Sequence, residues 1–251
     1  MSTVSNPMVE TPSAPVVPTN APAAPPSPVK VRVPVLIDEE ALIPEWVVDH
    51  ESFRRWATSE DLPRRGWFSF IDGTIWVERT REEFFSHNQT KSAYNTTLGP
   101  LVDAVQSGYY VPDRCLWSNV DFGISTEADA MFFTYDALKT GRIRLIAGKK
   151  RGYLEVEGTP DSILEIVSDS SVKKDTIVLK DKCEKAGVRE YWLVDARGAE
   201  PDFQIWRLDN GTYQPAPNDQ GWLTSEVFGK AFKLVQRNDP LGHPQYQLLV
   251  R

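Results

Sequence analysis

The stretch that most constrains the fold covers residues 160–195. It begins with an apolar run, 163–167, which has the length and composition of a buried strand but contains one acid, Glu165. A polar turn, a helical segment that stops at Gly187 and a second apolar run, 191–194, follow. Strand, helix and strand within about 35 residues predict a βαβ unit whose two strands are parallel neighbours.

A carboxylate inside a core strand costs several kcal/mol unless something pairs with it. Glu165 therefore needs a partner, and a metal ion is a good candidate. In the helix that follows, we expect Cys183 and Ala186 to face the sheet. Gly187 suits the left-handed cap that ends many helices, because it lacks a Cβ atom.

The first 34 residues differ in kind from the rest of the chain. They hold nine of the 19 prolines and no Phe, Tyr or Trp, so they cannot bury enough apolar surface to offset their chain entropy. We expect residues 1–34 to be a disordered, dispensable tail. Residues 35–251, which contain all eight Trp, are expected to form one domain with a sizeable core.

The net charge of −7 and the pI of about 5.1 argue against a protein that binds nucleic acid through bulk electrostatics. The basic runs 54–55, 64–65 and 149–151 could still line a small groove, or could be solvated surface charge. The sequence shows no secretory signal and no apolar window of the ~18 residues that a membrane helix needs. Cys115 and Cys183 form no CxxC pair, so we expect a cytoplasmic protein without a disulfide framework.

Outside the central unit, the pattern predicts a mixed α/β (α+β) architecture with additional hairpins. Asp72-Gly73 between two β-rich runs is a strong signal for a type I′ turn. Residues 81–106 form the longest helical candidate, although Pro100 inside it could kink or end the helix. The remaining predictions are a short helix at 51–57 and strands within 108–122 and at 128–133, 142–146, 152–156, 203–208, 221–227 and 232–235.

Two acids that share one hard cation must lie close together, because each ligand oxygen sits about 2.0–2.6 Å from the ion. Asp161 and Glu165 point to the same face of their strand but lie roughly 13 Å apart along it. An acid on a neighbouring strand is a better partner for Glu165, and Asp129, at the start of an apolar run, qualifies. The alternative is that Asp129 caps a turn and Glu165 forms a buried ion pair.

Several motifs together carry a resemblance to a known family. They are "IDG" at 71–73, His87 in "SHNQ", "ADAMFF" from Ala128, "PDSILEIVS" from Pro160 and "AGVREYWLVD" from Ala186. From about residue 63 to the C-terminus, the chain resembles the Uma2 family of bacterial proteins, which is placed among the endonucleases of the PD-(D/E)xK superfamily. A lone His is more often structural than catalytic, so His87 by itself indicates little.

The resemblance implies a restriction-endonuclease-like fold, a mixed sheet flanked by helices, that hydrolyses phosphodiester bonds with Mg²⁺ or Mn²⁺. It matches Asp129 and Glu165 to the metal-binding acids. The lysine of the (D/E)xK motif is replaced by Val167. Family members often carry a lysine on the next helix instead, four residues after an aspartate that corresponds to Asp175, but that position is Leu179.

Two nearby lysines could supply the missing charge. Lys182 shares a helix face with Asp175 if the helix is regular, and Lys180 could reach the site with its long side chain. Each could equally be an ordinary solvated lysine. Asp161 is expected to support the site or to cap the start of its strand rather than to bind metal.

Three functions follow from these observations. The leading hypothesis is a divalent-metal-dependent endonuclease that acts on DNA. The main alternative is a binding or regulatory module of the same fold that has lost its lysine. The third is a hydrolase of the same fold with another substrate. The acidic net charge favours the second and third functions, whereas the two acids Asp129 and Glu165 favour the first. The sequence does not determine the oligomeric state, and a homodimer is one of the possibilities.

Overall fold

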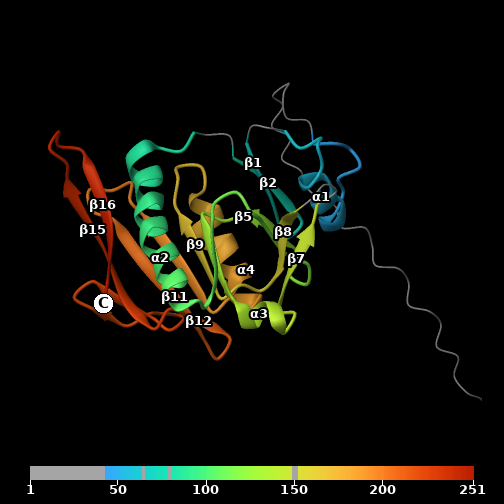
Figure 1. Ribbon diagram of the computed structural model, residues 1–251. Helices are drawn as coiled ribbons and strands as arrows, with labels where there is room; N and C mark the ends of the chain where they lie inside the picture. Colours follow the sequence, from blue (N-terminus) through green and yellow to red (C-terminus); the bar gives the residue numbers. More distant parts are fainter. Residues whose placement is uncertain (1–42, 64–65, 79–80, 149–151) are drawn as a thin grey trace, which may run out of the picture.

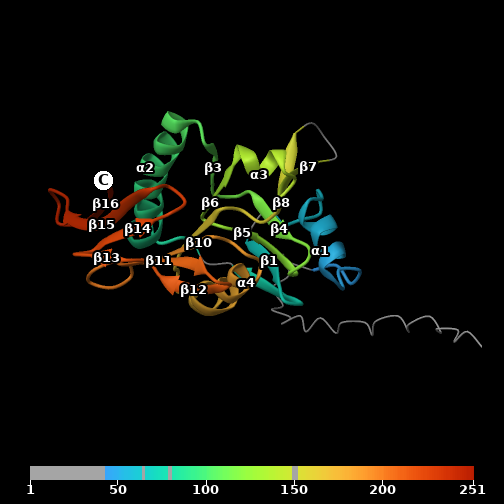
Figure 2. The ribbon, with the colours of Figure 1, turned by 90° about the horizontal axis from the view of Figure 1, so that it is seen from below.

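The computed structural model describes residues 43–63, 66–78, 81–148 and 152–251. The predicted tail (1–34), the boundary at residue 35 and the basic runs 64–65 and 149–151 lie outside the described residues. Within them, the chain forms three β-sheets and a few helices (Figures 1 and 2). The predicted fold class, a mixed sheet core flanked by helices with additional hairpins, is confirmed.

The first sheet has the strand order β2-β1-β5-β4-β8-β7, in which β4 and β8 run parallel and the other neighbours antiparallel. Its strands are β1 (Trp67–Ile71), β2 (Thr74–Glu78), β4 (Leu116–Asn119), β5 (Ile124–Glu127), β7 (Ile143–Ala147) and β8 (Tyr153–Gly158).

The second sheet has the order β12-β11-β10-β9-β6-β3, in which only β9 and β10 run parallel. Its strands are β3 (Gly108–Pro112), β6 (Ala130–Thr134), β9 (Ser162–Ile166), β10 (Glu190–Asp195), β11 (Asp202–Asp209) and β12 (Thr212–Pro215). The third sheet is an antiparallel meander of β13 (Asn218–Asp219), β14 (Trp222–Ser225), β15 (Lys230–Asn238) and β16 (Pro244–Val250).

The α-helices are α1 (His50–Ala57), α2 (Thr90–Val105), α3 (Tyr135–Lys139) and α4 (Lys180–Lys185). Two π-helical segments, η1 (Phe84–Gln89) and η2 (Lys174–Leu179), lead directly into α2 and α4. The single helix predicted at 81–106 is therefore a π-helical turn followed by an α-helix, and Pro100 lies within α2 without ending it. No helix among the described residues is long and apolar enough to cross a membrane.

The predicted βαβ unit is confirmed as β9, η2, α4 and β10. Strands β9 and β10 pair in parallel, with Glu165 opposite Leu193. Cys183 and Ala186 are buried, as predicted, in the core that these elements share. Gly187 follows the last helical turn with φ of +79°, a left-handed conformation in which a side chain would be strained.

The predicted hairpin at Asp72-Gly73 is also confirmed, since it joins β1 to β2. Asp72 and Gly73 both have positive φ, 53° and 73°, which a type I′ turn requires. The flanking residues Ile71 and Thr74 form the last cross-strand pair. This tight turn fixes the register of β2, and with it the position of Glu78 at the far end of the strand.

Strand β9 is buried on both of its faces. Ile163 packs in a core with Trp117 of the first sheet, whereas Leu164 packs in a second core with Leu98 of α2. Helix α2 lies between the second sheet and the β15–β16 hairpin, as Figure 1 shows. Burial from both sides explains the nearly continuous apolar run in the sequence. Because side chains alternate along a strand, Glu165 shares the face of Ile163 and points toward the first sheet.

Candidate active site

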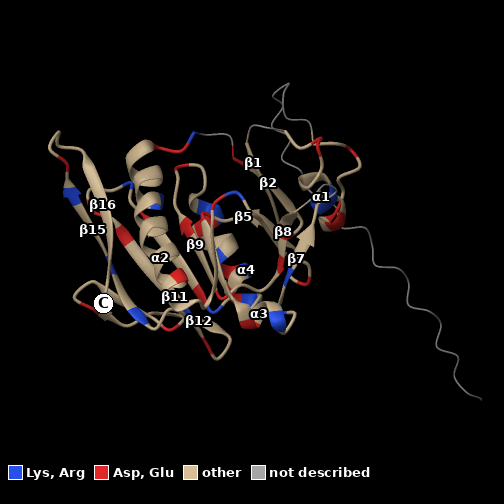
Figure 3. Cartoon of the chain, in the orientation of Figure 1, with Lys and Arg blue, Asp and Glu red and all other residues tan. Residues whose placement is uncertain are grey.

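A small acidic pocket of about 50 Å³ lies between the first and second sheets. Its walls come from β1, β2 and β5 on one side, and from the ends of β6 and β9 with segment η2 on the other. Three lining residues carry nitrogen groups that can be positively charged, namely Arg81, His87 and Lys174. Seven carry carboxylates: Glu78, Glu82, Asp113, Glu127, Asp129, Glu165 and Asp175. Figure 3 shows acidic and basic positions on several of the elements around β9.

Glu165 is one of two acids in this pocket, with Asp175, that have a buried oxygen without a hydrogen-bond partner. Its side chain is only 2 % exposed, and its Oε1 atom is buried without a hydrogen-bond partner. Burial raises the pKa of Glu165 well above its ordinary value, and the neighbouring carboxylates of Asp175, Asp129 and Glu78 add to the rise, partly offset by Lys174. A cation bound at Oε1 would reverse this destabilisation of the ionised form.

Asp129 lies across from Glu165, directly before the neighbouring strand β6. The β6–β9 register pairs Ala130 with Leu164, so one step further places Asp129 beside Glu165. Ile166 donates its backbone N–H to Asp129 Oδ2 over 2.7 Å, which fixes the orientation of the carboxylate. The structure thus brings together in one pocket the two acids that the sequence analysis paired.

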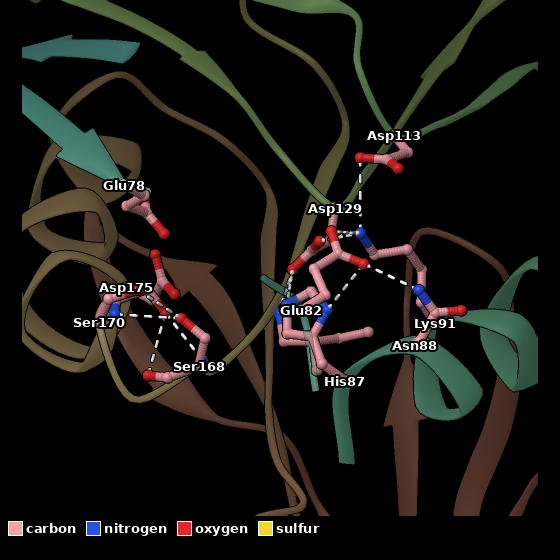
Figure 4. A network of polar contacts seen from close by, with 12 residues as sticks. Glu78, Glu82, His87, Asn88, Lys91, Asp113, Asp129, Ser168, Ser170 and Asp175 are labelled. Carbon is pink, nitrogen blue, oxygen red and sulfur yellow. Dashed lines mark hydrogen bonds and ion pairs between the residues drawn. The ribbon is translucent and has the colours of Figure 1, made fainter. Parts of the chain in front are cut away.

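Three residues from η1, α2 and the segment before them surround Asp129 (Figure 4). The ammonium of Lys91 lies 2.8 Å from Asp129 Oδ1 and 2.9 Å from Glu82 Oε1. His87 Nε2 is 3.6 Å from Asp129 Oδ2, and His87 Nδ1 is 3.5 Å from Glu82 Oε2. One ligand atom from each of Glu82, His87 and Asp129 lies within 4.8 Å of the others. His87 is therefore part of the pocket, although a lone histidine in the sequence gave little indication of a functional role.

The protonation of this group is set by its mutual contacts. The contact with His87, 3.5 Å between His87 Nδ1 and Glu82 Oε2, is the main cause that lowers the pKa of Glu82 to about 2, and Lys91 lowers it further. Burial opposes protonation of His87, but Glu82 and the charge of Asp129 outweigh it and raise the His87 pKa. Burial likewise opposes the charge on Lys91, yet Asp129 and Glu82 raise its pKa above the usual range.

A second group faces Glu165 from segment η2 and strand β2. The ammonium of Lys174 lies 2.5 Å from Glu78 Oε1 and 3.4 Å from Asp175 Oδ1. Asp175 is 1 % exposed, and its burial raises its pKa despite the nearby Lys174. Asp175 corresponds to an aspartate of the family pattern, whereas Lys174 and Glu78 were not among the predicted site residues. The only local signal was a lysine directly before that aspartate.

The two lysines named from the sequence as candidates lie elsewhere. Lys182 pairs with Asp72 at 2.7 Å, and the ammonium of Lys180 sits 3.1 Å from the ring centroid of Trp206. Neither lines the acidic pocket, and Leu179 is fully buried in the apolar core. The expectation assumed an α-helix from Asp175 onward, whereas η2 is π-helical, so the seven-residue spacing from Asp175 to Lys182 does not mark one face.

Asp161 is also outside the pocket, at the opposite end of β9. Arg142 donates to both of its carboxylate oxygens at 2.8 Å, Arg189 lies 3.4 Å away, and the backbone N–H of Thr134 donates over 2.9 Å. This arrangement matches the expected role at the start of the strand, since Asp161 ties β9 to the end of β6.

The donor set of the pocket suits a hard divalent cation. Carboxylate oxygens are the ligands that Mg²⁺ prefers, and a nearby imidazole is also compatible with Mn²⁺. Asp129 and Glu165 could hold such an ion, since both line the pocket and Glu165 Oε1 lacks any hydrogen-bond partner, and Glu82 and His87 offer further ligand atoms near Asp129.

The mixed α+β fold with its buried acidic pocket agrees with the class of protein that sequence comparison identifies. The profile of the Uma2 family, described as "Putative restriction endonuclease", matches residues 50–235. The chain belongs to the Uma2 family, so the resemblance noted in the sequence is confirmed. No curated protein matches the chain.

One solved structure similar to this chain is a crystal structure from Anabaena variabilis ATCC 29413, described as "a putative nuclease belonging to DUF820". It is 16% identical, with a TM-score of 0.49, and the match covers 72% of this chain and 91% of that chain.

Proposed function

We propose that this chain is a divalent-metal-dependent endonuclease that hydrolyses phosphodiester bonds in DNA, with Asp129 and Glu165 as the ligands of Mg²⁺ or Mn²⁺. One observation carries the proposal above all: Glu165 Oε1 is buried without a hydrogen-bond partner in a pocket with a surplus of carboxylates. Such an arrangement is costly in the metal-free protein, and a bound cation would offset the cost. Membership of the Uma2 family supports the nuclease activity.

A bound divalent ion would supply a water of lowered pKa and would neutralise charge on a phosphate. The protein's own residues prepare that position. Ile166 N–H and the Lys91 ammonium hold the Asp129 carboxylate in one orientation. Lys91 is in turn held by Glu82, so the orientation of Asp129 rests on contacts from two elements outside its own sheet.

The main alternative is a binding module that has lost catalysis. Val167 and Leu179, at the two positions where the family pattern carries a lysine, are both fully buried in the apolar core, and this favours the alternative. A binding module would take up metal or DNA without cleaving DNA. Cleavage and metal binding must therefore be measured separately.

The test combines a nuclease assay with calorimetry. Supercoiled plasmid, linear duplex and single-stranded DNA are incubated with the protein and Mg²⁺ or Mn²⁺, with EDTA as the control. We expect metal-dependent cleavage by the wild-type protein. Glu165→Gln and Asp129→Asn should each abolish cleavage and Mn²⁺ binding, because each removes a ligand.

Asp161→Asn is the matched control, since Asp161 is a buried acid of the same strand outside the pocket. At temperatures below its own melting temperature, the Asp161→Asn variant should still bind Mn²⁺ and cleave DNA. Tight Mn²⁺ binding by Glu165→Gln would refute the metal site. Metal binding without cleavage of any DNA by the wild-type protein would favour the binding module.

A further inference from the structure

The acidic pocket contains a buried ammonium group that the sequence pattern does not supply. Lys174 is 6 % exposed, lines the pocket, and lies within ion-pair distance of Glu78 and Asp175. Burying an ammonium is costly unless acids surround it. Here the charges of Asp175, Glu165 and Glu78 more than offset the burial and keep the pKa of Lys174 above its usual value. Lys174 is therefore a fixed positive charge that faces the same space as Glu165.

We propose that Lys174 is the catalytic lysine of this pocket and takes the place of the lysine absent at positions 167 and 179. The inference rests on the proposed nuclease function and deepens it. Once a metal ion is bound at Asp129 and Glu165, the Lys174 ammonium is the group placed to contact the attacking water or the scissile phosphate. A preorganised ammonium in a site that excludes water stabilises developing negative charge strongly.

The helix geometry explains how position 174 replaces position 179. Segment η2 has the i→i+5 hydrogen bonding of a π-helix, which is wider than an α-helix, so residues four and five apart both lie on the same side of it one turn later. Lys174 and Leu179 are such a pair. The side chain at 179 packs in the apolar core, while the side chain one turn earlier on the same side enters the acidic pocket.

The other nearby lysines do not fit this role. Lys91 lies within ion-pair distance of three acids, Glu82, Asp113 and Asp129, so it acts on the orientation of Asp129. Lys182 and Lys180 are engaged by Asp72 and Trp206. Glu78 holds Lys174 from strand β2, which means that the β1–β2 hairpin of the first sheet places the ammonium of a residue on η2.

The test compares Lys174→Met with Lys174→Arg, Lys182→Met and Lys185→Met. Lys185 is a matched control on α4, because it is exposed and pairs with Asp181 on the surface. We measure single-turnover cleavage of plasmid DNA, the Kd for Mn²⁺ by calorimetry, and the melting temperature. Lys174→Met should lower the cleavage rate by roughly 10²–10³-fold, the usual loss for a preorganised electrostatic group. Lys174→Arg, which keeps the charge, should recover part of the rate.

The Kd for Mn²⁺ separates a catalytic role from a structural one. Loss of a positive charge next to the acids should leave Mn²⁺ binding by Lys174→Met as tight as in the wild type or tighter. A purely structural lysine would weaken metal binding together with cleavage. If Lys174→Met does not fold, Lys174→Gln, which can still donate to Glu78, replaces it.

The outcomes also separate this inference from the function on which it rests. Wild-type cleavage that is lost in Glu165→Gln but kept in Lys174→Met overturns the role of Lys174 alone. If Lys182→Met loses DNA cleavage and Lys174→Met keeps it, the catalytic lysine is Lys182 on α4. A wild-type protein that cleaves no DNA overturns the proposed function and this inference with it.

Discussion

The two ends of strand β9 each hold a buried acid, and the surroundings of these acids differ in kind. At the start of the strand, Asp161 receives hydrogen bonds from Arg142, Arg189 and the backbone of Thr134. Near the end of the strand, Glu165 has a buried oxygen that receives none. Both side chains are almost fully buried, so the difference lies in their partners and not in their exposure.

A third buried acid, on the neighbouring strand, shows that the fold can satisfy such a group fully. Glu190 Oε2 accepts from Trp192 Nε1 and Ser225 Oγ, and its Oε1 accepts from the backbone N–H groups of Glu226 and Val227. Glu190 thereby ties β10 to the third sheet. Acids with complete sets of donors stabilise the structure, whereas an acid left without donors inside a pocket is suited to bind something else.

The largest effect on stability is expected for Glu190→Gln. The amide NH₂ of glutamine cannot accept a hydrogen bond, so at least one buried donor around position 190 loses its partner. We expect a loss of about 3 kcal/mol in the free energy of unfolding, measured by denaturant titration. The exposed Glu200→Gln serves as the control and should change little. An unchanged unfolding midpoint for Glu190→Gln would remove the distinction between satisfied and unsatisfied acids.

Asp161→Asn should have the next largest effect. The substitution removes the charge that Arg142 and Arg189 contact but leaves both guanidiniums able to reach water, so the loss should be about 2 kcal/mol. Asp169→Asn, which removes an ion pair of a 94 % exposed side chain with Arg197, is the matched control and should cost almost nothing. Equal effects of the two substitutions would show that the contacts of Asp161 contribute little.

Glu165→Gln is expected to change stability in the opposite direction. Without metal, burial next to Asp175 and Asp129 forces Glu165 to take up a proton on folding, whereas the amide is neutral in both states, so the free energy of unfolding should rise by about 1 kcal/mol. Melting curves in EDTA measure this effect. A clear loss of stability would mean that Glu165 has a structural partner, and the contrast with Asp161 would fail.

The smallest expected effect is on the pH dependence of the metal-free protein. The folded state keeps a proton on Glu165 that the unfolded chain releases above about pH 4.5, so this group lowers stability as the pH rises beyond that value. Glu165→Gln should flatten this decline.

Glu82 affects the pH dependence with the opposite sign, because its pKa is lowered to about 2. Its contribution is present above about pH 4.5 and is lost as the pH falls toward 2, and Glu82→Gln should remove that acid limb. Melting temperatures from pH 2 to 8 measure both limbs.

The parts of the fold that local sequence rules govern were predictable. The βαβ unit follows from two apolar runs around a helical segment, and the turns at Asp72-Gly73 and Gly187 follow from the backbone freedom of glycine. The pairing of Asp129 with Glu165 needed only strand periodicity and the search for a neighbouring acid.

The rest of the pocket depends on features with no local signal. The π-helical turn η2 changes the phase of the helix, so the regular spacing that pointed to Lys182 failed and Lys174 was overlooked. Glu82 and Lys91 are distant in sequence from Glu165, and only the packing of α2 against the second sheet brings them to Asp129. Contacts of this kind arise from tertiary structure and leave no periodic pattern in the chain.

The hydrogen bond from Ile166 to Asp129 has a consequence for solvent exchange. The carboxylate takes the position of a strand carbonyl, so the Ile166 amide proton is held by a side chain that also serves the proposed metal site. Deuterium uptake at this single amide should therefore slow further when Mn²⁺ is added, and should speed up in Asp129→Asn without a comparable change at Leu164 two residues earlier. One backbone proton on β9 thus becomes a direct reporter of whether the acid beside it is in place.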